Sequence, residues 1–143
     1  MAASTRQWLA RFLIGVVLLF NIQCAVVFIW SPQAYTSGFE LEGEIGAAML
    51  RGMGLLFVMW NIPYLFAAWQ PVKNRLSLYE AVLMQAIGFL GESAIFLTLP
   101  GNHPALHASL LRFIAFDGTG MVLLILAAWV THPTKRQRET PGR

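Results

Sequence analysis

The sequence predicts an all-α integral membrane protein, a four-helix bundle with up-and-down topology and short loops. Of its 143 residues, 57% are hydrophobic and 12% are charged, and the mean hydropathy is +0.58. This composition is too apolar for a soluble domain. The apolar residues form four segments, at 8–30, 45–69, 78–99 and 104–130.

Each of these segments is long enough, at about 1.5 Å per residue, to cross a hydrocarbon core of about 30 Å. A single segment in lipid must satisfy its own backbone hydrogen bonds, and the alternating pattern of a β-barrel strand is absent, so we expect helices. Because little of the chain remains outside them, residues 1–143 are predicted to be one membrane domain.

The first segment, residues 8–30, begins like a secretion signal, because Arg6 and Arg11 accompany the start of an apolar run. The run continues to Trp30 and no Ala-x-Ala cleavage site follows, so we expect the helix to be retained. Cys24 is the only cysteine. A single cysteine excludes an internal disulfide and a cysteine metal cluster. We expect Cys24 to be a small, buried apolar side chain.

The connection at residues 31–44 is the longest between two helices and mixes apolar side chains with three glutamates. This mixture predicts a short helix lying on the membrane surface. In the second helix, residues 45–69, Pro63 should cause a kink and release the backbone carbonyl near Met59. Asn61 is one polar neighbour available to that carbonyl.

Sequence signals at the starts of the last two helices predict how they are capped. The third helix, residues 78–99, is expected to begin at a capping box formed by Ser77 and Glu80. Asn102, ahead of Pro104, suits the start of the fourth helix. Within that helix, the Asp-Gly-Thr-Gly run at 117–120 either weakens the helix or allows a neighbour to pack closely.

The basic residues predict the orientation. Lys and Arg flank the start of the first helix, occupy the connection between the second and third, and recur in the tail at 131–143, whereas the other two connections contain none. By the positive-inside rule, both termini are cytoplasmic and the protein is a multi-pass protein of the cell inner (plasma) membrane, with a basic cytoplasmic tail. The net charge of +3 therefore requires no nucleic-acid partner.

Polar side chains within the apolar segments are the candidate site residues: Arg51, Glu92, Arg112, Asp117, Gln23, Gln85 and Asn61. Counted from the outer helix ends, Gln23, Arg51, Glu92 and Arg112 lie about 9 to 12 Å deep, one on each helix. Asp117 lies about 20 Å deep. A charge at the centre of a spanning helix costs about 2.5 to 3.5 kcal/mol. We therefore expect the four charges to face the bundle interior, with Glu92 and Arg112 as an intramembrane ion pair.

Such a cluster has two interpretations. Buried ion pairs can clasp helices together and contribute specificity with little net stability. Alternatively, Arg51 in "LRGMG" could hold a phosphate or a carboxylate through bidentate hydrogen bonds.

No catalytic residue is predicted, because the chain contains no serine nucleophile motif, phosphate loop or dinucleotide fingerprint. His103 and His107 are four residues apart, but no third ligand has a fixed spacing, so we predict no metal site. A haem would require a deep axial histidine, and none of the three histidines is deep. The sequence indicates no particular cofactor.

Four helices with short loops, a first helix that ends in an aromatic residue and Pro, and the Arg-Gly pair in "LRGMGLLF" resemble the DoxX-like group of small bacterial four-helix membrane proteins. The resemblance implies a compact bundle and association with membrane redox complexes. It assigns no functional residue to this chain.

Three functions are compatible with these observations. The first is a non-catalytic subunit or interaction protein, whose lipid-facing side docks a membrane-protein partner or a second copy of the chain. The second is a binder of a lipid-like or quinone-like ligand, with its head group at Arg51 and Arg112. The third is a small proton-coupled carrier that uses Glu92 and Asp117, for which four helices are few unless the chain forms oligomers.

Overall fold

A computed structural model describes residues 3–132 of the chain. Its long helices are α1 (Ala3–Trp30), α3 (Gly43–Trp69), α4 (Arg75–Thr98) and α5 (Pro104–Val130), and two short segments, α2 (Gln33–Thr36) and η1 (Ser37–Phe39), connect α1 to α3. Within the described residues there is no strand, so the all-α four-helix fold is confirmed. Of the predicted basic tail, residues 133–143 lie outside the described residues.

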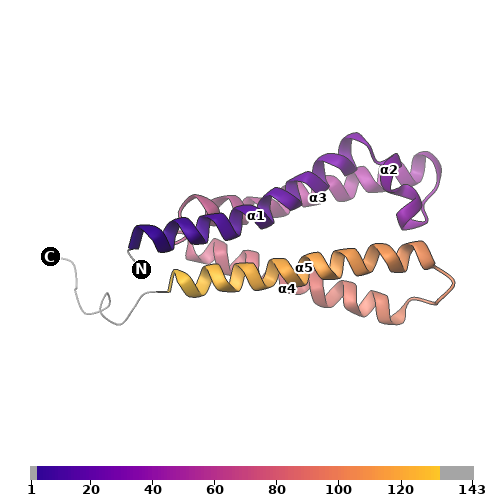
Figure 1. The fold of residues 1–143 in the computed structure, drawn as a ribbon. Coiled ribbons are helices and arrows are strands. Elements are labelled where there is room, and N and C mark those ends of the chain that lie inside the picture. Colours follow the sequence, from indigo (N-terminus) through magenta and orange to yellow (C-terminus); the bar gives the residue numbers. More distant parts are fainter. Residues whose placement is uncertain (1–2, 133–143) are drawn as a thin grey trace.

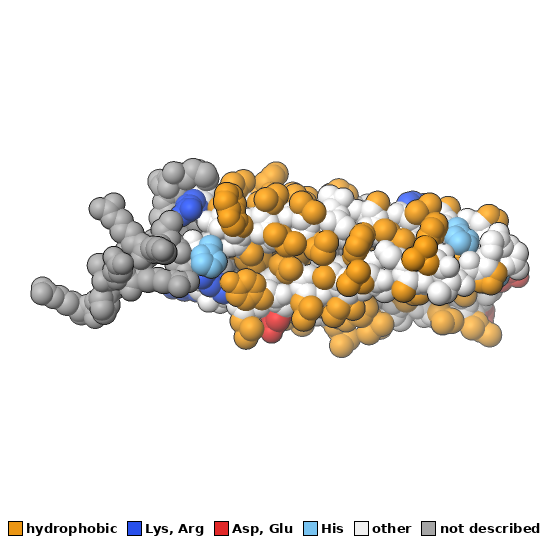
Figure 2. Space-filling model, turned by 90° about the horizontal axis from the view of Figure 1, so that it is seen from below, with side chains coloured by type: hydrophobic (Ala, Val, Ile, Leu, Met, Phe, Trp, Pro, Cys, Tyr) orange, Lys and Arg blue, Asp and Glu red, His pale blue; other side chains and the backbone are white. Residues whose placement is uncertain are grey.

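All four long helices are long and apolar enough to cross a membrane. Their outward faces carry large apolar side chains, including Trp8, Trp30, Ile45, Leu97 and Trp129, each more than three-fifths exposed. Figure 2 shows such side chains along the whole visible face, with charged and histidine side chains mostly near the two ends. This surface suits lipid rather than water, so the chain is a small multi-pass membrane protein.

The helices alternate in direction, and neighbours around the bundle follow the order α1, α3, α4, α5. Figure 1 shows the start of α1 and the end of α5 at one end, which we call the terminal end. The α1–α3 connection and the α4–α5 loop lie at the other, which we call the loop end. Fully buried apolar residues from all four helices, among them Ile14, Leu78 and Leu124, pack together in the terminal half.

A second set of apolar contacts closes the loop end. The buried ring of Phe28 on α1 lies against four aromatic rings, those of Tyr35, Phe39, Phe57 and Phe113. Tyr35 and Phe39 come from α2 and η1, so the short helical segments in the connection fold back onto the bundle.

The predicted capping box at Ser77 and Glu80 is wrong. Helix α4 begins at Arg75, and its N-cap is Asn74, which makes no side-chain capping bond. The Asn74 Nδ2 instead donates to the Phe66 carbonyl, 2.7 Å away, near the end of α3. This bond, between residues eight apart, closes the turn between α3 and α4.

The start of α5, by contrast, is capped from a distance, and not by Asn102. The N-cap residue His103 makes no side-chain capping bond to the helix. Glu40, at the end of η1, accepts hydrogen bonds at Oε1 from the backbone N–H groups of Ala105 and Leu106, at 3.1 and 3.3 Å. A carboxylate at a helix N-terminus satisfies free donors and interacts favourably with the helix dipole.

Glu40 adopts a left-handed backbone conformation, with φ of 54°. Non-glycine residues rarely occupy this region, and each such residue costs of order 1–3 kcal/mol unless its surroundings hold it there. The contacts to α5 provide that hold, because Glu40 Oε2 also lies 2.6 Å from His103 Nδ1. We call Glu40, His103 and the first turn of α5 the loop-end clamp.

Candidate functional site

A cavity of about 360 Å³ opens among the four long helices, with walls from all of them. We call it the acidic cavity. Its polar lining residues are Asn21 of α1, Asn61 and Tyr64 of α3, Gln85 and Glu92 of α4, and Asp117 of α5. Its apolar lining includes Phe57, Trp60, Met84 and Ile87.

A chain of hydrogen bonds crosses the inner part of the cavity. The Tyr64 hydroxyl donates to Gln85 Oε1 at 2.7 Å. The Gln85 Nε2 in turn donates to Asp117 Oδ1, also at 2.7 Å. Tyr64 and Gln85 are each only 3% exposed, so these bonds satisfy groups that would otherwise be buried and unpaired. The network joins α3, α4 and α5 at one level.

Two glycines make room for this network. A Cβ atom on Gly88 of α4 would overlap Asp117 Oδ2, and a Cβ atom on Gly120 of α5 would come within 2.7 Å of Gln85 Nε2. Each polar side chain therefore occupies space that the glycine of the opposite helix leaves open. The Asp-Gly-Thr-Gly run thus accommodates a neighbouring side chain at Gly120.

Two acceptor oxygens in the same cavity have no partner. Glu92 Oε2 and Asn61 Oδ1 are both buried and accept no hydrogen bond. Asn61 is fixed by its other end, because its Nδ2 donates to the Phe57 carbonyl at 2.6 Å, and not to the carbonyl near Met59 that we had expected. A buried acceptor without a partner costs about 1–3 kcal/mol. A hydrogen-bond donor placed in the cavity would remove this cost.

The predicted ion pair between Glu92 and Arg112 is wrong. Arg112 Nη2 donates to Ser109 Oγ at 2.9 Å, and the ion pair found among the described residues is the one between His103 and Glu40. Equal depth does not place two side chains on facing sides, and the five residues from Arg112 to Asp117 turn α5 by about 140°. Asp117 faces the acidic cavity, while Arg112 lines a different one.

The prediction that all four charges face the bundle interior is wrong for Arg51 as well, since its side chain is exposed on α3. Arg51 lines none of the three cavities described here. Gln23 is also exposed and lies beside Arg112 in a groove of about 420 Å³. The seven candidate residues therefore separate into a cavity group (Glu92, Asp117, Gln85 and Asn61), a groove pair (Gln23 and Arg112) and Arg51 by itself.

Asn21 and Tyr64 belong to the cavity but were not among the predicted site residues. Asn21 is buried and its side chain interacts with the Tyr64 hydroxyl. A signal for Tyr64 was present in the sequence, because a buried tyrosine hydroxyl usually needs a hydrogen-bond partner. Its position in an apolar helix gave no indication of which helix would supply one.

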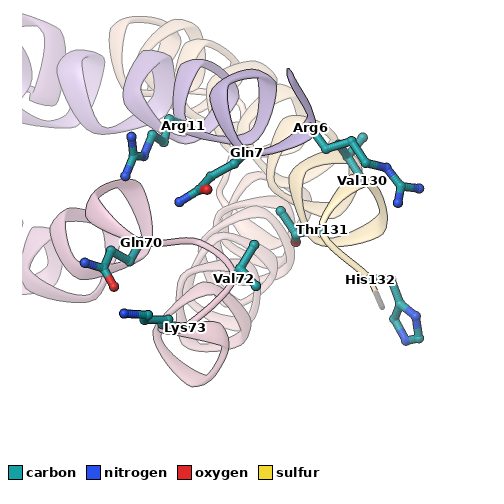
Figure 3. A pocket seen from close by; sticks show the side chains of 9 residues that line it. All are labelled: Arg6, Gln7, Arg11, Gln70, Val72, Lys73, Val130, Thr131 and His132. Carbon is teal, nitrogen blue, oxygen red and sulfur yellow. The ribbon is translucent and has the colours of Figure 1, made fainter. Parts of the chain in front are cut away.

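A third cavity, of about 370 Å³, lies at the terminal end and is lined by Arg6, Arg11 and Lys73 among others. In Figure 3, the side chains of Arg11 and Lys73 extend toward one side of the view and those of Arg6 and His132 toward the other. Arg11 is already engaged: its Nε and Nη2 donate to the Trp69 carbonyl at 3.0 and 2.6 Å. This cavity therefore contains a contact that fastens α1 to the end of α3.

The acidic cavity differs from the other two in its charge. Two carboxylates line it and no lysine or arginine does. Among the described residues, no group of three or more metal-ligating side chains is placed to hold a metal ion. In a low-dielectric cavity, two carboxylates must be neutralised by protons or by a positively charged occupant.

Comparisons with known proteins add no assignment. The sequence matches no family model, and it shows no significant similarity to the curated proteins or to the solved structures with which it was compared.

Proposed function

We propose that this membrane protein binds small amphiphilic cations in the acidic cavity in exchange for protons, as a small proton-coupled carrier. The observation that carries the proposal is the pair of unpartnered acceptors, Glu92 Oε2 and Asn61 Oδ1, in one cavity. An ammonium group supplies several donors and a positive charge at once. An ammonium group placed at Glu92 would donate to its Oε2 and neutralise the carboxylate, and a further donor on the same molecule would satisfy Asn61 Oδ1.

Asp117 contributes a second negative charge to the same cavity. One of its oxygens is held by Gln85, so its carboxylate is fixed in position, while that of Glu92 has an oxygen available to an occupant. Protons that neutralise the empty cavity would leave when a cation enters, because the two compete for the same carboxylates. This competition links cation binding to proton release.

The walls of the cavity fit the apolar part of such a molecule. Phe57, Trp60, Met84 and Ile87 contribute ring, thioether and alkyl surface. Trp60 and Ile87 are also about half exposed or more on the outside of the bundle, and α3 and α4 form the least closely packed seam around it. A lipid-soluble cation could therefore enter between α3 and α4 from the bilayer.

The other two functions have less support. The interaction-protein function was linked to a charge clasp, which would need an ion pair that Glu92 and Arg112 do not form. A head-group site built from both arginines would need Arg51 in a cavity with Arg112. For the orientation, we propose cytoplasmic termini in the inner membrane. Arg6, Arg11, Lys73 and Arg75 cluster at the terminal end, which supports it.

Three probes of similar shape test the proposal: phenethylammonium, 2-phenylethanol and phenylacetate, titrated by calorimetry into the protein in lipid nanodiscs. The cation should bind, the alcohol should bind more weakly and the anion should not bind. Glu92→Gln should weaken cation binding by about 1.5 to 3 kcal/mol, because the ammonium then donates to a neutral amide oxygen and the charge-assisted bond to a carboxylate is lost. Glu80→Gln is the matched control, since Glu80 is exposed on the same helix outside the cavity.

Two further measurements test the exchange. In lightly buffered solution, cation binding should release protons, and Glu92→Gln should reduce the number released. In proteoliposomes, an outwardly directed proton gradient should drive uptake of phenethylammonium. Equal binding of cation and anion would refute the cation site, and binding without gradient-driven uptake would refute the carrier.

A further inference from the structure

A second concave surface, at the loop end, has an opposite charge character. The groove of about 420 Å³ beside α1 and α5 is lined by Arg112, Ser109, Gln23 and Tyr35 on its polar part. Its apolar part includes Phe20 and Phe116, whose rings lie 6.0 Å apart. We call it the aromatic groove.

Arg112 lacks an anionic partner among the described residues. Its guanidinium donates to the neutral Ser109 hydroxyl, which itself donates to the Gly38 carbonyl at 2.6 Å. A guanidinium has five N–H donors, so most of them remain available. An arginine within a spanning helix is costly unless a counter-ion or water satisfies it.

The position of the guanidinium indicates where a counter-ion would lie. Arg112 Nη2 would be 3.6 Å from a Cβ atom on Gly38, so the side chain reaches the level of η1 at the loop end. Phe20 and Phe116 lie ten residues from the end of α1 and twelve from the start of α5, about 15 to 18 Å from the loop end, whereas Arg112 lies eight residues, about 12 Å, from the start of α5. The groove thus has a cationic upper part and an apolar lower part, arranged along the bundle axis.

We infer that the aromatic groove binds an anionic phospholipid, with the lipid phosphate at Arg112 and an acyl chain along Phe20 and Phe116. Arginine forms paired hydrogen bonds with phosphate oxygens. The acyl chain covers aromatic surface that is open to the bilayer, since Phe20 is 52% exposed. This site shares Phe57 with the wall of the acidic cavity, but its polar residues are different ones and it does not depend on the function proposed for that cavity.

Native mass spectrometry of the detergent-solubilised protein tests this site, with phosphatidylglycerol and phosphatidylcholine of identical acyl chains as probes. Phosphatidylglycerol should be retained preferentially, and Arg112→Gln should weaken its retention about fivefold. Arg51→Gln is the matched control, because Arg51 is also exposed and lies eight residues from the loop-end terminus of its helix, as Arg112 does. Retention of phosphatidylglycerol by the Arg51→Gln variant should change less than twofold.

Two additional arms separate the sources of the phosphate and the role of charge. Glycerol phosphate, which lacks acyl chains, should not displace the lipid, because part of the binding free energy comes from contacts between the acyl chain and the apolar walls of the groove. Arg112→Lys keeps the charge and loses the paired hydrogen bonds, so its retention of phosphatidylglycerol should lie between that of the wild type and that of Arg112→Gln. Equal losses for Arg51→Gln and Arg112→Gln, or displacement by glycerol phosphate, would overturn the inference.

Discussion

Gln85 and Asp117 reach across the interface between α4 and α5, and each side chain lies over a glycine of the opposite helix. Their hydrogen bond, 2.7 Å from Gln85 Nε2 to Asp117 Oδ1, sits between Gly88 and Gly120. In lipid, where the hydrophobic effect does not drive helices together, small residues and interhelical hydrogen bonds hold them. This arrangement positions both the bundle and the acidic cavity.

The first prediction concerns Gly88. Gly88→Ala should destabilise the bundle by about 1 to 3 kcal/mol, because the added methyl group overpacks the site of the Asp117 carboxylate. Gly91→Ala, one turn later, is the control, because a Cβ atom there meets nothing within 4 Å. Unfolding by sodium dodecyl sulfate, followed by circular dichroism, would measure both. Equal stability of the two variants would contradict the close packing at Gly88.

The second prediction concerns the Tyr64 hydroxyl. Tyr64→Phe keeps the ring but removes the donor to Gln85 Oε1, so stability should fall by about 0.5 to 2 kcal/mol. Tyr79→Phe should have no measurable effect, because Tyr79 is 49% exposed. The same unfolding assay applies. A Tyr64→Phe variant as stable as the Tyr79 control would show that the hydroxyl contributes nothing to the network.

The third prediction concerns the pH dependence of the loop-end clamp. The hydrogen bond from His103, together with those from the backbone N–H groups of Leu106 and Ala105, lowers the pKa of Glu40 from its ordinary value. A carboxyl group whose folded pKa is lowered contributes stability above its unfolded pKa and loses it as the pH falls through the folded value. The melting temperature should therefore drop on acidification below about pH 4.5.

Glu40→Gln should remove part of this acid sensitivity, because the glutamine cannot be protonated in that range. Glu44→Gln is the control, since Glu44 lies in the first turn of α3 outside the clamp. Melting temperatures of the three proteins, recorded from pH 7 to pH 3, test the idea. Parallel curves for wild type and Glu40→Gln would exclude the clamp as an acid-labile contact.

Composition and hydropathy predicted the four membrane-spanning helices, but not the rotation of each helix about its axis, which decides where a side chain faces. Hydropathy located the four spans because each must be long enough to cross the bilayer. Residue counting placed Glu92 and Arg112 at similar depths, but depth leaves open which way each side chain faces. The capping of α5 by Glu40 was equally out of reach, because it joins residues 65 apart and depends on a left-handed backbone that sequence pattern does not reveal.

The final prediction compares two pairs by double-mutant cycles. Gln85→Leu combined with Asp117→Leu should show a coupling energy of about 0.5 to 3 kcal/mol, as expected for residues that share a hydrogen bond. Glu92→Gln combined with Arg112→Gln should be additive within about 0.5 kcal/mol, because each faces a different cavity. Stability in the detergent unfolding assay measures both cycles. Strong coupling between Glu92 and Arg112 would mean that the two side chains pair in the membrane. The Arg112 guanidinium would then lie in the acidic cavity and not in the aromatic groove, where the structure places it.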